Sequence, residues 1–434
     1  MHSSLSSWLS WQETLHPSTI DLGLDRVRVV LQRLGFQKPD APVITIAGTK
    51  GKGSCAAMLD SIYAASGYRT GVFTSPHLQR YNERIRINQQ EVSDESLCVA
   101  FERIDVARGD ISLTYFEFNT LAALLTFSTA ALDVWILEIG MGGRLDAVNV
   151  IDSDIAMVTS IGLDHTEWLG NDLESIGREK AGVFRANRPA LYGSATMPKS
   201  IQQVANEVGA YLLKADRDFG FDEEGQIWSW WMKQNDRQME LKALSAPGIE
   251  GSIQKWNASL VLAAVQLLSL RLPVTQQAIN AGLVNTKTSG RFQRVVPKNS
   301  SAEWILDVAH NPMSALVLAR HLYEDRTRRG ATEKPTTLAI FGMLSDKDID
   351  GTITALRDEV DEWIAVTLPG TRALTATQVA EHLRHSNVTV AAELNSIDEA
   401  CDLAARRANI DRIVVCGSFH AVGPALAWLE RRTE

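Results

Sequence analysis

A lysine- and glycine-rich loop offers the clearest chemistry in this sequence. Within seven residues it combines three glycines, two lysines and two hydroxyl side chains. The members of the loop are Gly48, Thr49, Lys50, Gly51, Lys52, Gly53 and Ser54. Backbone N–H groups in such a turn, together with a helix N-terminus, favour an anion, and glycines let phosphates approach the backbone. We therefore expect Lys52 to reach the outer phosphates of a nucleotide, with Ser54 or Thr49 placing a hydroxyl on Mg²⁺.

The loop departs from the strict phosphate-loop pattern G-x-x-x-x-G-K-[ST]. Ile46 stands where the first glycine belongs, and Gly53 stands at the Ser/Thr position. The alternative interpretation is a tight turn without a ligand. The density of glycines, lysines and hydroxyls favours the phosphate site over that alternative.

Three further polar residues follow predicted strands. Ser75, Glu138 and His165 each lie at or just past the end of an apolar run rich in β-branched residues. The carboxyl ends of parallel strands share one edge of a sheet, so we expect these side chains near the phosphate loop. A carboxylate in a buried strand is costly unless it is paired or binds a metal, so Glu138 is a candidate Mg²⁺ ligand.

Two other segments are ambiguous from their residues alone. Residues 112–119 set Thr114, Tyr115 and Phe116 beside Glu117. This is either plain packing at the start of a helix or an aromatic slot for a flat heterocycle, with Glu117 bonding its ring nitrogens. Lys180 lies in a predicted helix over 174–182, and by itself it has the character of a solvated surface lysine.

These residues belong to a predicted α/β fold. Strands alternating with helices predict a mostly parallel sheet, and tryptophans alternating with polar residues over 219–245 predict a small antiparallel side ribbon. A helix opening at Asn257 follows. Later strands, none followed by G-x-G-x-x-G, predict a smaller Rossmann-like domain. We predict a large P-loop-type ATPase domain over 1–295 and a Rossmann-like C-terminal domain over 296–434.

Composition narrows the class of protein. The 434 residues are 45% hydrophobic and 22% charged, with a net charge of −9, which is ordinary for a globular protein and argues against nucleic acid as a partner. Four cysteines without a C-x-x-C pair indicate a reducing compartment. Met1–Trp11 lacks the features of a signal peptide and no apolar run is long enough to span a membrane. We expect a cytoplasmic monomer with no membrane partner.

Eight ordered motifs, spread over about residues 20 to 425, resemble the bacterial dihydrofolate synthase/folylpolyglutamate synthase family of the Mur ligase superfamily. The motifs are Gly48–Ser54, Thr74–Leu78, Leu113–Glu117, Gly142–Ala147, Leu163–Thr166, Gly177–Gly182, Gly290–Gln293 and Asp307–Pro312. The family usually has Asn where this chain has Lys50, which adds positive charge beside the phosphates. It also usually has other residues at Met141 and Val148.

The resemblance implies the reaction. ATP phosphorylates a carboxylate of a pterin substrate, the amine of L-glutamate attacks the acyl phosphate, and an amide, ADP and phosphate result. Dihydropteroate gives dihydrofolate, and reduced folates give folylpolyglutamates. The family pattern also implies two Mg²⁺ sites, held by Ser75, Glu138, His165 and a carbamylated Lys180.

The family pattern assigns the remaining site residues as well. Thr114 to Glu117, with Leu145, Asp146 and Ala147, match the dihydropteroate pocket. Asn257, Arg291 and Asp307 match nucleotide contacts, the last two from across the domain junction. Apart from the family pattern, His310 and His420 lie on predicted loops of the C-terminal domain and are weak candidates, His310 for a catalytic role.

Three rival functions remain open at this stage. The first is a folylpolyglutamate synthase without dihydropteroate activity, against which the Leu113–Glu117 motif argues. The second is another Mur-type ligase, and the third is a regulatory ATP-binding module. A regulatory module would not need Glu138, His165 and Lys180 together with a second domain.

Overall fold

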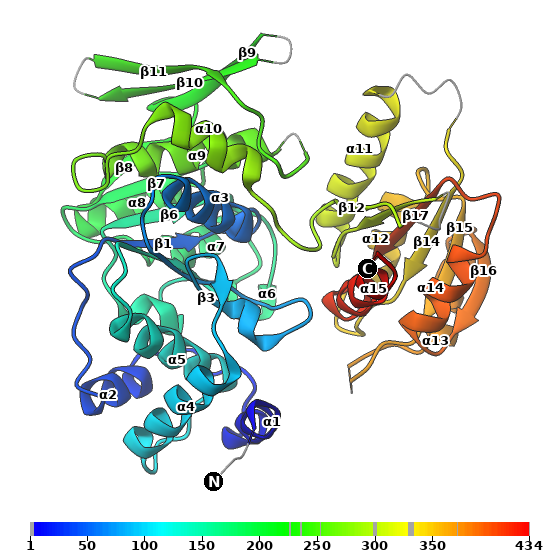
Figure 1. Ribbon diagram of the computed structural model, residues 1–434, viewed down its shortest axis with the longest axis horizontal. Coiled ribbons are helices and arrows are strands. Elements are labelled where there is room, and N and C mark those ends of the chain that lie inside the picture. Colours follow the sequence, from blue (N-terminus) through cyan, green and yellow to red (C-terminus); the bar gives the residue numbers. More distant parts are fainter. Residues whose placement is uncertain are drawn as a thin grey trace. The chain divides into compact units, whose positions relative to one another are not determined.

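The computed structural model describes residues 4–224, 227–234, 237–251, 253–297, 302–328, 334–370 and 372–433. The chain forms two compact units. The first unit comprises residues 1–77, 81–248 and 253–287. The second comprises 288–434 and two short segments from earlier in the chain, 78–80 and 249–252. The predicted α/β class is confirmed, with one large and one smaller sheet (Figure 1).

The first unit is built on an eight-stranded sheet in the order β4-β3-β2-β5-β1-β6-β7-β8. Strands β2, β5, β1, β6, β7 and β8 are parallel, and β3 and β4 add an antiparallel edge. The strands are β1 (Val43–Ala47), β2 (Thr70–Phe73), β3 (Ile85–Ile87), β4 (Gln90–Glu91), β5 (Val134–Glu138), β6 (Ile155–Val158), β7 (Pro189–Tyr192) and β8 (Tyr211–Lys214). Because β2, β5, β1 and β6 are neighbours, the loops that follow them share one edge of the sheet.

The helices of this unit pack against the sheet or, like α1, α2 and α4, against other helices (Figure 1). They are α1 (Leu5–Leu15), α2 (Asp25–Arg33), α3 (Lys52–Ala65), η1 (Tyr81–Arg84), α4 (Asp94–Arg108), α5 (Tyr115–Thr129), η2 (Ala147–Val150), α6 (Thr166–Leu169), α7 (Leu173–Ala181), α8 (Lys199–Val208), α9 (Ile253–Leu267) and α10 (Gln276–Asn285). The helix predicted to open at Asn257 begins one turn earlier, at Ile253, so Asn257 is inside α9 and 5% exposed.

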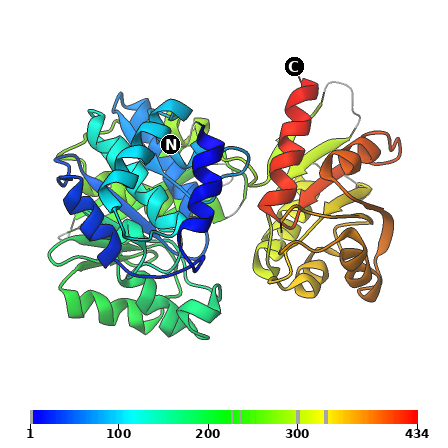
Figure 2. The same cartoon turned by 90° about the horizontal axis from the view of Figure 1, so that it is seen from below.

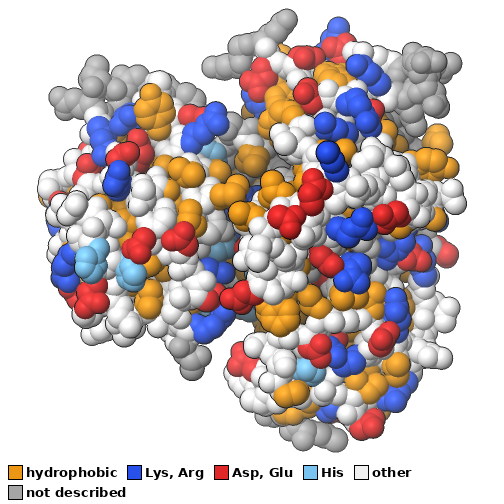
Figure 3. Space-filling model, turned by 180° about the vertical axis from the view of Figure 1, so that it is seen from behind, with side chains coloured by type: hydrophobic (Ala, Val, Ile, Leu, Met, Phe, Trp, Pro, Cys, Tyr) orange, Lys and Arg blue, Asp and Glu red, His pale blue; other side chains and the backbone are white. Residues whose placement is uncertain are grey.

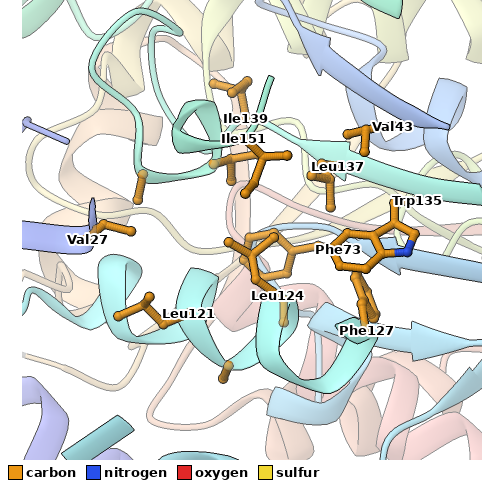
Figure 4. Close-up of a cluster of buried hydrophobic side chains, with 14 of the residues drawn as sticks. Val27, Val43, Phe73, Leu121, Leu124, Phe127, Trp135, Leu137, Ile139 and Ile151 are labelled. Carbon is orange, nitrogen blue, oxygen red and sulfur yellow. The ribbon is translucent and has the colours of Figure 1, made fainter. Parts of the chain in front are cut away.

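The main core lies between α5 and the sheet. Figure 4 shows Leu124 and Phe127 of α5 beside Phe73 and Trp135 of the strands, with Leu121 farther along the same helix. All five side chains are buried, and Phe127 meets Trp135 edge-on with ring centroids 5.4 Å apart. Burying each such side chain contributes about 1.5–3 kcal/mol, so this face fixes where the N-terminus of α5 must lie.

The predicted side ribbon is a three-stranded antiparallel sheet in the order β11-β10-β9. Its strands are β9 (Phe219–Glu224), β10 (Ile227–Gln234) and β11 (Arg237–Leu244). Trp228 and Trp230 are buried, and the indole N–H of Trp230 donates to the carbonyl of Ser259 in α9 at 3.0 Å. The ribbon is therefore held on the first unit by its tryptophans.

The second unit carries a six-stranded sheet in the order β12-β13-β17-β14-β15-β16, parallel except for β12. Its strands are β12 (Gln293–Val295), β13 (Glu303–Leu306), β14 (Thr337–Phe341), β15 (Glu362–Val366), β16 (Thr389–Leu394) and β17 (Arg412–Cys416). Its helices are α11 (Pro312–Arg328), α12 (Ile349–Leu356), α13 (Ala376–His385), α14 (Ile397–Ala405) and α15 (Phe419–Thr433). Figure 2 shows α15 lying along the sheet of this unit.

The second unit begins at Thr288 rather than at residue 296. Strand β12 pairs with β13, with Gln293 opposite Leu306. The Gly290–Gln293 motif, which the sequence prediction assigned to the first domain, thus lies in the second unit.

Surface charge is mixed. On the face shown in Figure 3, acidic and basic side chains intermingle over both units instead of gathering in one large basic area. Among the described residues, no helix has the length and apolar character needed to cross a membrane.

Candidate active site

The predicted phosphate loop connects β1 to α3 and takes the conformation that its glycines allow. Gly48 and Gly51 have φ angles of 135° and 88°, which L-residues with side chains rarely adopt. A Cβ on Gly51 would lie 2.5 Å from Asn257 Oδ1, and one on Gly48 would overlap the hydroxyl of Thr159. That hydroxyl donates to the carbonyl of Lys50 at 2.5 Å. The backbone is therefore closely packed on two sides, as a fixed anion cradle requires.

The two loop hydroxyls differ in their surroundings. Thr49 Oγ1 donates to the carbonyl of Gly162 at 3.2 Å and accepts from the N–H of the same residue at 3.0 Å. Thr49 therefore ties the loop to the segment after β6. Ser54 is 7% exposed in the first turn of α3. These contacts favour Ser54 over Thr49 as the hydroxyl available to a ligand.

Two lysines meet at this loop. Lys52, the first residue of α3, donates from Nζ to the carbonyl oxygen of Gly48 at 3.1 Å. Lys180, in the last turn of α7, donates to the same oxygen at 2.9 Å. The loop carbonyl thus brings two ammonium-bearing side chains from distant parts of the chain to one point.

Lys180 is not the solvated surface lysine that its local sequence suggested, because only 4% of it is exposed. Burial, reinforced by the charge of Lys52, lowers the pKa of Lys180 to about 7. Both causes disfavour the charged amine. A large fraction of Lys180 is therefore neutral and nucleophilic near neutral pH.

Glu138 ends β5 directly beside the loop. It is 4% exposed, lies opposite Ile46 in the β1–β5 register, and accepts from the backbone N–H of Ser75 at 3.2 Å. The structure therefore brings together the strand ends that carry Ser75 and Glu138. A buried carboxylate and a serine hydroxyl are oxygen donors of the kind that Mg²⁺ prefers.

His165 occupies a different setting. It is the N-cap of the short helix α6 with a left-handed φ of 49°, and its side chain is 41% exposed. Its Nε2 lies 3.9 Å from Asp164 Oδ2. In the described part of the chain, no three His, Cys, Asp or Glu side chains converge as a ready-made metal cluster. A metal held here would need the Ser75 hydroxyl or the Lys180 side chain as well.

The second glycine-rich loop places Asp146 near both lysines. Asp146 is 2% exposed and accepts from the backbone N–H groups of Met141 and Val148, each at 2.9 Å. Burial raises the pKa of Asp146 to about 7, while these N–H groups and the charge of Lys52 oppose the rise. Its neighbours Leu145 and Ala147 are partly and fully buried, respectively. The predicted acceptor contacts at 145–147 therefore lie within electrostatic range of the phosphate loop.

The Thr114–Glu117 segment forms the start of α5. Thr114 is the N-cap and Glu117 the third residue of a reciprocal capping box, with Glu117 Oε2 accepting from the Thr114 N–H at 2.8 Å. The same carboxylate pairs with the guanidinium of Arg26 at 3.0 Å. Because both oxygens are engaged, the geometry favours the packing alternative for Glu117.

The aromatic members of that segment remain open to a ligand. Phe116 lies against Gly140, where a Cβ would come within 2.5 Å of its ring. Tyr115 is partly buried, with Arg84 5.7 Å from its ring centroid. Phe116 and Asp146 therefore both border the second glycine-rich loop.

The remaining predicted residues lie in the second unit. Asp307 accepts from the N–H groups of Phe292 and Ala309 at 2.9 and 3.0 Å, and burial raises its pKa against the opposing charge of Arg291. The guanidinium of Arg291 lies 5.5 Å from the ring centroid of Phe419. Asp307 follows β13, Arg291 lies just before β12, and Phe419 is the first residue of α15.

The two candidate histidines follow strands of this sheet, His310 between β13 and α11 and His420 at the start of α15. The ring of His310 is 6.0 Å from that of Phe419. His420 is the second residue of α15, and its backbone N–H donates to Ser418 Oγ at 3.1 Å. Burial lowers the pKa of His420.

Sequence reasoning missed several residues that hold this site together. Arg26 of α2, which pairs with Glu117, and Thr159, which follows β6 and bonds the phosphate loop, were not among the predicted site residues. Asn149 joins the second glycine-rich loop to α7 through its side-chain amide. A hydroxyl or amide just past a predicted strand or glycine turn was the available signal for Thr159 and Asn149. No local signal pointed to Arg26.

Comparison with known proteins agrees with this fold. Residues 46–254 match the Mur ligase middle domain, and residues 290–419 match the Mur ligase glutamate ligase domain. The fold and the loop therefore define a ligase of the Mur class. The chain is 44% identical to the dihydrofolate synthase/folylpolyglutamate synthase of Escherichia coli K12, over 99% of this chain and 96% of that relative. The chain belongs to the dihydrofolate synthase/folylpolyglutamate synthase family.

Solved structures support the same assignment. A structure of Escherichia coli FolC with DHPP and ADP has a TM-score of 0.89 and 43% identity, covering 100% of this chain and 99% of that one. A structure of the bifunctional enzyme from Yersinia pestis with AMPPNP and a Mn ion has a TM-score of 0.87 and 45% identity, covering 99% and 98%.

Proposed function

We propose that this protein joins L-glutamate to dihydropteroate, giving dihydrofolate, and to reduced folates, giving folylpolyglutamates, with ATP as the energy source. The observation that carries the proposal is the meeting of Lys52 and Lys180 at the Gly48 carbonyl, with buried Glu138 and Asp146 alongside. The family to which the chain belongs and the ligands named for its solved relatives support the same reaction.

The phosphate loop would bind the nucleotide. Its backbone N–H groups and the N-terminus of α3 favour the phosphates, and Lys52 places a positive charge at the outer ones. The oxygen donors of Ser75 and Glu138 fit a divalent metal, and His165 is a further proposed ligand. When bound, the metal neutralises charge on the transferring phosphoryl group.

Lys180 is proposed to carry a carbamate. Its neutral amine would attack CO₂, forming an N–C bond and releasing one proton, which converts a potential cation into an anion. Burial supports this step because it keeps the amine neutral near pH 7. The carbamate oxygens would then supply ligands for a second metal site.

The acceptor would lie along the second glycine-rich loop. Tyr115 and Phe116 offer aromatic surface for a pterin ring, and Leu145, Asp146 and Ala147 offer apolar and polar contacts. Thr114 and Glu117 would act by holding the start of α5. Once the acceptor carboxylate is phosphorylated, the amine of L-glutamate would attack it and phosphate would leave.

The other assignments stay predictions. They are nucleotide contacts from Asn257, Arg291 and Asp307, catalysis by His310, a weaker part for His420, a monomeric state, and a cytoplasmic location without nucleic-acid or membrane partners.

The deciding experiment is phosphate release from ATP with Mg²⁺ and L-glutamate, measured with dihydropteroate, with tetrahydrofolate and with neither. Release with both acceptors is the expected result. Release with tetrahydrofolate alone would identify a folylpolyglutamate synthase lacking dihydropteroate activity. Absence of phosphate release with both dihydropteroate and tetrahydrofolate would contradict the proposal.

A further inference from the structure

The side chain of Asn149 joins two parts of the candidate site. Asn149 lies in η2 and is 5% exposed. Its Nδ2 donates to the carbonyls of Arg144 at 3.1 Å and Gly182 at 3.0 Å, and its Oδ1 accepts from Arg185 Nη2 at 2.9 Å. Both amide donors are therefore used. One holds the second glycine-rich loop and the other holds the end of α7.

Close backbone packing occurs at the same junction. The N–H of Arg144 donates to the carbonyl of Glu179 at 2.9 Å. A Cβ on Gly143 would lie 2.8 Å from that carbonyl oxygen and 3.1 Å from Lys180 Cα. The last turn of α7 and the loop therefore meet as a single packed body. The exposed pair of Arg144 with Glu179 bonds across it at the surface, and the Asn149 side chain bonds across it where it is buried.

We propose that Asn149 is a positioning residue for Lys180. Gly182 is the C-cap of α7, and carbonyls at a helix end lack partners within the helix. By donating to the Gly182 carbonyl, Asn149 fixes the turn that carries Lys180, whose Nζ must reach the phosphate loop along a flexible stem. The consequence for catalysis rests on the proposed function of Lys180.

Asp146 is held independently of Asn149. Its carboxylate accepts from the N–H groups of Met141 and Val148, and neither bond involves the Asn149 side chain. Loss of the Asn149 amide should therefore loosen Lys180 more than the proposed acceptor contacts. The expected kinetic signature is a lower kcat with little change in the KM for the acceptor.

The test compares Asn149→Ala and Asn149→Asp with a matched control. Asn149→Asp keeps the volume and the oxygen facing Arg185 but places an acceptor against two carbonyls. The control is the double variant Ser61→Ala and Thr286→Val, which also removes two buried donors, both directed at the Gly282 carbonyl. Melting temperatures of all variants show whether the losses of stability are comparable.

The first readout is independent of ligase activity. Labelling of Lys180 by an amine reagent at fixed pH, followed by peptide mass spectrometry, reports its protection. We expect labelling of Lys180 to be about tenfold faster in the Asn149 variants than in the wild type, because the turn opens locally. The control variant should be labelled at the wild-type rate. An unchanged labelling rate would overturn the proposal whatever the ligase assay shows.

The second readout uses turnover. We expect kcat to fall about ten- to hundredfold in the Asn149 variants, the scale of a displacement near 1 Å. In a Lys180→Ala background supplied with formate, adding Asn149→Ala should change the rescued rate by less than about twofold, because the residue it positions is gone. If Asn149→Ala lowers the formate-rescued rate of the Lys180→Ala variant by as large a factor as it lowers kcat of the wild type, the proposal is overturned. Absence of glutamate-dependent turnover in the wild type would instead count against the proposed function.

Discussion

Lys52 and Lys180 donate to one acceptor, the carbonyl oxygen of Gly48, at 3.1 and 2.9 Å. Two ammonium groups at one buried point repel each other, and burial removes the water that would screen them. The result is an asymmetric pair, in which the pKa of Lys180 falls to about 7. The phosphate loop thus has a reactive amine, that of Lys180, held against its carbonyl oxygen from the end of α7.

Replacing Lys180 tests the proposed carbamate. Lys180→Ala should lower kcat about 10²- to 10³-fold, the scale of losing one charge-stabilising group. Formate or acetate should restore part of the activity by supplying the missing carboxylate. A carbamate signal in ¹³C NMR with labelled bicarbonate should be present in the wild type and absent in the variant. The exposed Lys199 provides the control, because Lys199→Ala should change neither measurement. Full activity of Lys180→Ala without rescue would show that no carbamate is needed.

Replacing Lys52 or Glu138 tests the nucleotide and metal assignments. Lys52→Ala and Glu138→Ala should each reduce ATP turnover about 10³-fold or more, because phosphoryl transfer depends on positioned charge. Circular dichroism and melting temperature would verify that the fold is retained. Glu207→Ala, which removes an exposed carboxylate paired with Arg178, is the matched control. Near-normal turnover in either site variant would refute its assignment.

Replacing Glu117 tests its engagement with Arg26. Glu117→Ala removes the capping box and leaves Arg26 without this partner, so we expect about 2–4 kcal/mol loss in the free energy of unfolding. The KM for dihydropteroate should rise more than the KM for ATP, because Phe116 is one residue away. Urea denaturation and steady-state kinetics measure the two effects.

The control for Glu117 is Asp25→Ala, which breaks an exposed pair with Arg28 and should cost at most about 1 kcal/mol. Equal losses in the two variants, or a rise confined to the KM for ATP, would contradict the interpretation of Glu117.

The buried side chain of His321 should make the stability of the protein depend on pH. It is 5% exposed, neither ring nitrogen has a hydrogen-bond partner among the described residues, and its ring meets that of Phe292 edge-on. Burial lowers its pKa, as does Arg320, whereas Asp307, Glu324 and Glu250 raise it. The unfolded chain therefore binds the proton more readily than the folded protein.

The sign of the effect follows from that difference. Stability should be fully present above the ordinary histidine pKa of about 6.5 and should decline as pH falls below it, by up to about 1.4 kcal/mol per pH unit. Melting curves between about pH 5 and 8 should show a shallower decline for His321→Gln than for the wild type. Parallel curves for the two proteins would mean that His321 does not titrate in this range.

Local sequence patterns alone were enough to predict several features of this protein. Glycines and lysines at 48–54 specified the phosphate loop, because few other functions need that combination. Apolar β-branched runs ending in Ser75 and Glu138 placed those residues at one edge, because parallel strands share their direction. Alternating tryptophans specified the side ribbon by their period of two.

Other features depended on contacts between distant segments, which no local pattern encodes. The sequence of α7 alone indicated an exposed Lys180, and only packing against the phosphate loop buries it and lowers its pKa. Glu117 could have faced a ligand or the protein, and the structure pairs it with Arg26 from another helix. Asn149 acquired its role only when the glycine-rich loop and α7 were brought together. Residue types set the available chemistry, whereas burial and long-range partners decided charge state and position, because both depend on what surrounds a side chain in space.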